Sequence, residues 1–81
     1  MFENINKDKK LEILETAKPI HEVLLYESIV RLGIDPETFD MDSFEGTEEN
    51  YGLGNMEFCQ NADKAIAALK MINREITSLE I

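Results

Sequence analysis

The amino-acid sequence predicts an all-α protein: a small bundle of three main helices with a short helical turn and an acidic, glycine-containing loop. Three observations carry this prediction. Apolar residues recur at helical spacing over residues 58–79, helix-start signals stand at Pro19 and at Asp35-Pro36, and glycine-punctuated polar sequence separates the periodic stretches. The 81 residues suffice for a single domain with a modest core, a size at which self-association often adds stability.

The first helix is expected over residues 6–17. Asn4 or Asn6 can accept a hydrogen bond from the first turn, Asp8 places a negative charge near the helix N-terminus, and apolar residues recur after it at helical spacing. Pro19 has no backbone N–H to donate within a helix, so a corner is predicted at residues 16–19.

The second helix is expected over residues 19–32. The fixed φ of Pro19 suits the first position of a helix, and Gly33 supplies a stop signal after the last one. Apolar residues occupy a wide arc of this helix, which is typical of a helix at the centre of a bundle. The sequence therefore predicts that residues 19–32 form the most buried element.

A short helix over residues 36–43 and an acidic loop over residues 44–54 are expected next. Asp35 can cap the short helix, with Pro36 in its first position. The loop segment combines glycines with acidic residues, which favour neither helix nor strand. Aromatic side chains can fix a loop on a core, and three recur here: Phe39, Phe44 and Tyr51.

The last helix is expected over residues 55–79. Its apolar residues have an unbroken 4-3-4-3-4-3 spacing, which is the a/d seam of three heptads. This seam consists of Phe58, Ala62, Ala65, Leu69, Ile72, Ile76 and Leu79. A seam of this regularity requires a neighbouring helix, either within the chain or in a second copy, so the seam residues are candidates for self-association in a homodimer.

The net charge of −9 is concentrated in the middle of the chain. The whole sequence holds 17 acidic and 8 basic residues, yet no Lys or Arg occurs between Arg31 and Lys64. Nine acidic residues lie in that interval: Asp35, Glu37, Asp40, Asp42, Glu45, Glu48, Glu49, Glu57 and Asp63. Because the flanking regions are neutral in sum, the charge predicts either a solubilising connection or a surface for a positively charged partner.

The composition excludes several functional classes. No apolar run is long enough to span a bilayer, and residues 1–10 lack the apolar core of a secretory signal, so a cytoplasmic protein is expected. One cysteine and one histidine provide neither an internal disulfide nor a structural zinc site, and no metal or other cofactor is expected. Phosphate backbones and anionic lipids would repel so acidic a chain, which disfavours direct binding to nucleic acids or membranes.

The sequence also lacks a recognisable catalytic motif. His21 and the glutamate after it begin like a zinc-protease helix, but Leu25 stands where the second histidine ligand is required. Asp40 begins a stretch like a calcium loop, but Phe44 stands where an oxygen ligand is needed. Cys59 lies among acidic residues, which raise a thiol pKa and predict an unreactive side chain. Without a nucleophile, base and orienting group, no enzymatic activity is expected.

The function that the sequence favours is non-enzymatic protein binding, by a small regulator or inhibitor. A negatively charged surface in the central segment would dock on a basic partner. If the carboxylates are spaced like phosphates, the basic groove of a partner that handles nucleic acid would recognise this surface as it recognises DNA. A small acidic protein of this type fits the role of a phage accessory protein or of an antitoxin, and no motif in the sequence favours one over the other. The partner-binding candidates are Asp35, Glu37, Asp40, Asp42, Glu45, Glu48 and Glu49.

The alternative function is structural assembly. In that interpretation the seam over residues 58–79 makes the functional contact between copies of the chain. The acidic segment then only keeps the assembly soluble, because like charges on neighbouring molecules repel each other. The two functions differ in which surface binds: the acidic segment in the first and the last helix in the second.

Overall fold

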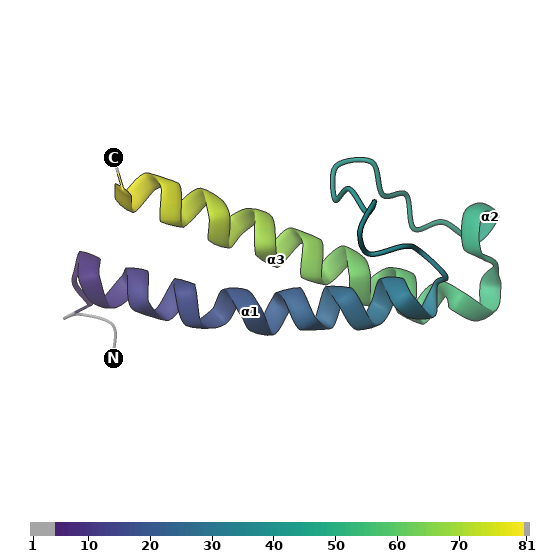
Figure 1. Ribbon diagram of the computed structural model, residues 1–81, viewed down its shortest axis with the longest axis horizontal. Coiled ribbons are helices and arrows are strands. Elements are labelled where there is room, and N and C mark those ends of the chain that lie inside the picture. The colour runs from purple at the N-terminus through teal and green to yellow at the C-terminus, as the bar shows by residue number, and fades with distance from the viewer. Residues whose placement is uncertain (1–4, 81) are drawn as a thin grey trace.

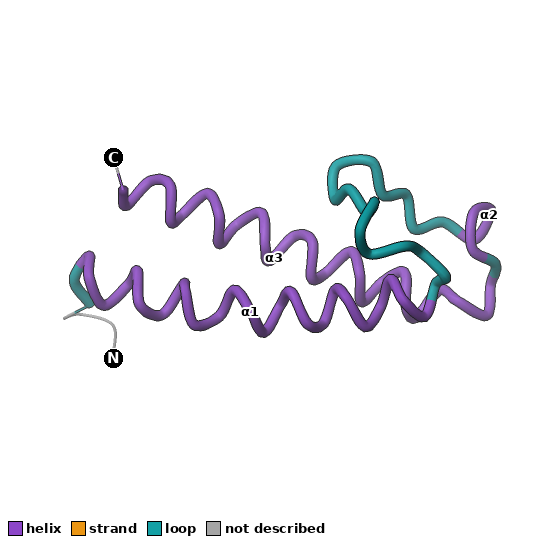
Figure 2. The backbone as a smooth tube through the Cα atoms, in the orientation of Figure 1, coloured by secondary structure: helices purple, strands orange, loops and turns teal. Residues whose placement is uncertain are grey.

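The computed structural model describes residues 5–80, which form an antiparallel pair of long helices (Figure 1). Helix α1 spans Lys7–Arg31 and helix α3 spans Met56–Glu80, each with 25 residues. The segment 32–55 joins them and is called here the acidic connection (Figure 2). Helices, turns and loops account for all of the described residues, with no strand among them, which confirms the all-α prediction.

Helix α1 is continuous through Pro19, where the sequence predicted a corner between two helices. The missing N–H of Pro19 leaves the carbonyl of Glu15 without its helical donor, but both residues are exposed, so water can bind this carbonyl. Helix α3 contacts α1 on both sides of the proline. Before Pro19, Lys10 of α1 forms an ion pair with Glu75 of α3 at 2.9 Å. After Pro19, Leu25 of α1 packs in the buried cluster with residues of α3. This packing outweighs the local cost of the proline, so one long helix replaces the two expected at 6–17 and 19–32.

Replacement of Pro19 by alanine should stabilise the protein. Pro19→Ala restores the hydrogen bond to the Glu15 carbonyl and relieves the crowding by the proline ring. The free energy of unfolding should rise by roughly 1–3 kcal/mol. This range already allows for the larger conformational entropy that alanine gives the unfolded chain. Urea unfolding followed by far-ultraviolet circular dichroism measures it. Pro36→Ala, outside the helices, is the control and should gain nothing. An unchanged or lower stability of Pro19→Ala would contradict the prediction.

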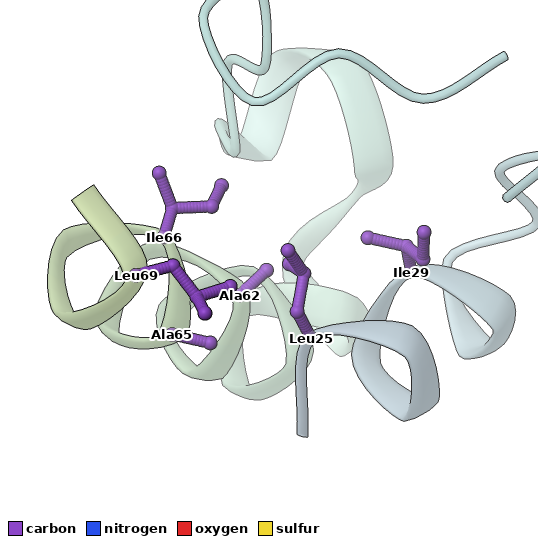
Figure 3. Packing of buried hydrophobic residues seen from close by; sticks show 6 residues of the cluster. All are labelled: Leu25, Ile29, Ala62, Ala65, Ile66 and Leu69. Atoms are coloured by element: carbon purple, nitrogen blue, oxygen red, sulfur yellow. The ribbon is translucent and has the colours of Figure 1, made fainter. Parts of the chain in front are cut away.

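The core lies between the two long helices, in the half of the pair next to the acidic connection. Figure 3 shows the buried cluster, which consists of Leu25, Ile29, Ala62, Ala65, Ile66 and Leu69. The two alanines leave room for α1 to approach α3 closely, since the distance between packed helices depends on the side chains at the contact. Towards the other end of the pair, the apolar residues Leu11, Leu14, Ile76 and Leu79 are only half-buried.

The short helix expected over residues 36–43 is replaced by two separate turns, at 36–38 and 41–43. Asp35 forms the hydrogen bond expected of a helix cap, since its Oδ1 accepts from the Glu37 N–H at 2.9 Å, but only a turn follows it and no helix begins there. Asp, Ser and Thr side chains bond to the backbone close by, and these bonds compete with helix propagation.

The segment 44–54, expected to be loop throughout, contains the short helix α2, Glu48–Tyr51, and most of a 3-10 turn η1, Leu53–Asn55. The hydroxyl oxygen of Thr47 accepts a hydrogen bond from the Asn50 N–H at 3.2 Å and caps α2. The last helix, expected over 55–79, is α3, whose bounds differ from the prediction by one residue at each end.

The molecule is elongated, with principal dimensions of 46 × 27 × 16 Å. Its radius of gyration is 15.0 Å, whereas a compact domain of this length has about 12 Å. The elongation indicates a helix pair rather than a closed bundle, in which each helix has neighbours on several faces. The prediction that residues 19–32 form the most buried element is therefore wrong: Val23, Leu24 and Tyr26 are 59%, 53% and 53% exposed, and α3 holds more of the buried residues than α1.

Candidate functional site

The acidic residues of the central segment all lie at the surface. The seven partner-binding candidates belong to the acidic connection, and every one is exposed: Asp35, Glu37, Asp40, Asp42, Glu45, Glu48 and Glu49. Among residues 5–80, only Asp42 of these seven forms an ion pair, through Oδ1 at 3.0 Å from Lys70 Nζ. The acidic connection thus presents a negative surface that the chain's own cations compensate at one point.

Two copies of a five-residue pattern build the first half of the acidic connection: Asp35-Pro36-Glu37-Thr38-Phe39 and Asp40-Met41-Asp42-Ser43-Phe44. In each copy, Oδ1 of the first aspartate accepts a hydrogen bond from the backbone N–H of the third residue, at 2.9 Å and 3.0 Å respectively. The hydroxyl of the fourth residue donates to the carbonyl of the same aspartate, at 3.4 Å and 3.3 Å. Two equivalent turns therefore hold the acidic side chains. Sequence reasoning missed this repeat, although its spacing is visible in the sequence.

A row of aromatic rings fixes the acidic connection on the helices. The ring centroid of Phe44 lies 5.8 Å from that of Phe39 and 5.7 Å from that of Tyr51. Phe39 and Phe44 also pack against the buried cluster of α1 and α3, as do Ile34 and Met41. The expectation that aromatic residues fix the segment on the core is confirmed for Phe39 and Phe44.

The acidic connection passes close to Cys59 of α3 at Gly46. A Cβ added there would lie 2.9 Å from the Phe44 ring and 3.0 Å from the Cβ of Cys59, so only glycine fits this approach without a shift of its neighbours. Cys59 is fully buried. Burial raises the pKa of the Cys59 thiol, and the negative charge of Asp63 raises it further. The thiol is shielded and protonated, in agreement with the unreactive cysteine that the sequence predicted.

The seam residues lie along the face of α3 that is turned towards α1. Four are buried, namely Ala62, Ala65, Leu69 and Ile72, and three are half-buried, namely Phe58, Ile76 and Leu79. Ala62, Ala65 and Leu69 share one cluster with Leu25 and Ile29 of α1 (Figure 3). The seam therefore has a neighbouring helix within the chain, and a homodimer through it stays a prediction.

Metal centres and membrane-spanning helices are two further kinds of site that a helical protein can carry. Within residues 5–80, no three His, Cys, Asp or Glu side chains come together in a group that could hold a metal ion. In the same range, none of the helices combines the length and the apolar character needed to cross a bilayer. The chemistry offered by the exposed carboxylates is charge attraction and hydrogen-bond acceptance, which match the Lys and Arg side chains of a protein partner.

The acidic connection is the candidate functional site because it combines uncompensated charge with a fixed shape. Paired turns and the aromatic row position its carboxylates, and Asp42 alone has a cationic neighbour among the described residues. Comparison with known proteins adds no functional assignment: no family model, curated protein or solved structure matches this chain.

Proposed function

We propose that this chain is a non-enzymatic binding protein, a regulator or inhibitor whose acidic connection docks on a basic surface of another protein. The observation that supports it best is the fixed display of seven exposed carboxylates, of which only Asp42 is paired among the described residues. A disordered tail could carry the same charge. An ordered surface loses less conformational entropy when it binds, so it is the better recognition element.

Charge would guide this encounter over a long range. The acidic connection contains seven acidic residues and no Lys or Arg. Such a field speeds association with a basic partner, and added salt weakens it because counter-ions screen exposed charges beyond about 8–10 Å. A binding mode of this kind therefore depends strongly on ionic strength, and a basic nucleic-acid-binding groove on the partner is one surface that would fit it.

The test is partner capture from an extract of the native host, at low and at high salt, with a variant that neutralises the acidic connection. The variant carries Asp40→Asn, Asp42→Asn, Glu45→Gln, Glu48→Gln and Glu49→Gln. Asparagine at position 40 keeps the Oδ1 acceptor that closes the second turn, so the shape is preserved while the charge is removed. Capture at low salt should fall about tenfold or more, with unchanged helical content.

The matched control removes the same number of charges outside the acidic connection, through Asp8→Asn, Glu12→Gln, Glu15→Gln, Glu22→Gln and Glu80→Gln. This control should capture the partner as the wild type does, because it keeps all seven acidic residues of the acidic connection. The net charge changes equally in both variants, so a difference between them depends on where the charges lie. Equal losses in the two variants, or capture that is insensitive to both salt and neutralisation, would reject the proposal. Duplex DNA added as a competitor should displace the protein if the partner's basic surface also binds nucleic acid.

A further inference from the structure

Helix α1 carries an apolar stripe that does not face α3. This α1 stripe consists of Ile13, Ala17, Ile20 and Leu24, at the 4-3-4 spacing of a helix-packing seam. Ile13 is 47% exposed, Ile20 58% and Leu24 53%. The residues of α1 that join the core, Leu25 and Ile29, lie on a different face. A helix with apolar residues on two faces is normally covered on both, and residues 5–80 cover only one.

The acidic connection covers one side of the helix pair and leaves the α1 stripe open. On the covered side, a hollow of about 230 Å³ is lined by both helices together with Phe39 and Met41 of the connection. On the other side, a groove of about 390 Å³ runs between Leu24 of α1 and Phe58 of α3, without any residue of the connection. A further hollow of about 360 Å³ lies along the α1 stripe itself. The open face therefore extends along α1 for several turns.

We propose that a second copy of the chain covers this face, with the two α1 helices antiparallel and a two-fold axis near residues 18–19. In this arrangement each stripe residue lies opposite the residue of the partner subunit whose number brings the sum of the two numbers to 37. Ile13 then lies opposite Leu24 of the partner subunit, and the small Ala17 lies opposite the larger Ile20 of the partner subunit. The two-fold axis repeats both contacts, and the two helix pairs become a four-helix bundle.

Charge complementarity favours a second copy in this orientation. Lys9 lies one turn before Ile13, and Glu27 lies one turn after Leu24. These two residues are 18 positions apart, about five helical turns, so they lie on the same flank of the α1 stripe. Antiparallel helices bring Lys9 to within one residue, about 1.5 Å along the axis, of the position opposite Glu27 of the partner subunit, and the symmetry makes this pair twice. In a parallel dimer the partner subunit's Glu27 would lie about five helical turns away from Lys9, so this pair could not form.

The position of the acidic connection favours the same orientation. It lies beside the half of the helix pair in which α1 ends and α3 begins (Figure 1). Antiparallel packing places the two acidic connections at opposite ends of the dimer, whereas parallel packing would bring their negative charges together. Helix α1 holds five acidic and five basic residues, so the contacting helices themselves are neutral in sum. This dimer is independent of the proposed partner-binding function.

Light scattering after size-exclusion chromatography tests the dimer. The wild type should show twice the 9.3 kDa mass of the single chain at micromolar to sub-millimolar concentrations. Ile20→Glu should leave the fold of each chain intact, since Ile20 is exposed, but it places a charge from each copy in the apolar contact and should weaken the dimer by about a hundredfold or more. Leu53→Glu, at the most exposed of the large apolar residues in the described range, is the control and should stay dimeric. A monomeric wild type would overturn the proposal.

Charge reversal and cross-linking test the orientation. In the antiparallel dimer, where position 9 lies beside Glu27 of the partner subunit, Lys9→Glu should weaken dimerisation by roughly three- to thirtyfold. In a parallel dimer the same substitution should have no effect. An equimolar mixture of Ile13→Cys and Leu24→Cys chains should form a disulfide-linked dimer on mild oxidation, because these positions face each other. Each variant alone should not, since its two cysteines would lie about 16 Å apart along the helices. Cys59 is buried and does not interfere. Cross-linking of Ile13→Cys with itself would overturn the antiparallel arrangement.

Discussion

Leu69→Ala should lower the free energy of unfolding by about 3–4 kcal/mol. Leu69 is 3% exposed and belongs to the cluster that joins the two long helices. Removal of its side chain leaves a cavity between α1 and α3, and the neighbours Ala62 and Ala65 are too small to fill it. A chain of 81 residues has a total stability of roughly 4–12 kcal/mol, so this loss is a large part of the whole.

The matched control is Leu53→Ala, the same substitution at a leucine that is 72% exposed. Its effect should stay within about 0.5 kcal/mol, because no packed neighbours are lost. Urea and thermal unfolding measure both variants, and Leu69→Ala should lower Tm by at least about 12 °C. All samples need one protein concentration, since self-association would add to the apparent stability. Similar losses in the two variants would mean that the core lies elsewhere.

The helix that contains Leu69 could be predicted from the sequence to within one residue at each end. The apolar spacing from Phe58 to Leu79 is unbroken, and no proline or glycine interrupts α3. Local preference, periodicity and tertiary packing therefore agree over this element, which is the condition under which a single sequence is most informative. The pattern does not identify the helix that packs on this seam, because a helix of the same chain and a helix of a second copy both fit it.

The continuity of α1 could not be predicted in the same way. A proline in a helix interior costs about 3 kcal/mol, so the local sequence around Pro19 correctly favours a break. The outcome depends on contacts that are distant in sequence, such as the packing of Leu25 of α1 in one buried cluster with Leu69 of α3. The same limit applies to burial. The apolar arc of residues 19–32 indicates a helix that packs against neighbours on several faces, but the pattern does not identify which of these neighbours belong to the same chain.

The charge of the acidic connection could be predicted, but its shape could not. Asp35 is an equally good first residue for a helix and for a side-chain turn, because both use the same hydrogen bond to a backbone N–H. The residues after Asp35 decide between the two. Apolar residues at Phe39, Met41 and Phe44 do not recur at helical spacing, and the repeated five-residue pattern favours two turns. With that repeat recognised, the sequence predicts the ordered turns.

Phe44→Ala should separate the shape of the acidic connection from its charge. The Phe44 ring is tilted against Phe39 and stacked on Tyr51, with centroid distances of 5.8 Å and 5.7 Å, and it leaves no room for a Cβ at Gly46. Loss of this half-buried ring should cost about 2 kcal/mol and release the acidic connection from the helices. Hydrogen exchange should then show faster exchange of the amides over residues 35–47, while α1 and α3 stay protected.

Partner capture by Phe44→Ala should also fall by about tenfold, although the net charge of −9 is unchanged, because binding would then have to order the released segment. Phe44→Leu keeps an apolar side chain at this position and should retain most of the capture and of the protection. Full capture by Phe44→Ala with unprotected amides would mean that charge alone recognises the partner and that the paired turns serve only the fold. Loss of capture in both the neutralised variant and Phe44→Ala would instead mean that recognition requires charge and shape together, since each variant leaves the other property in place.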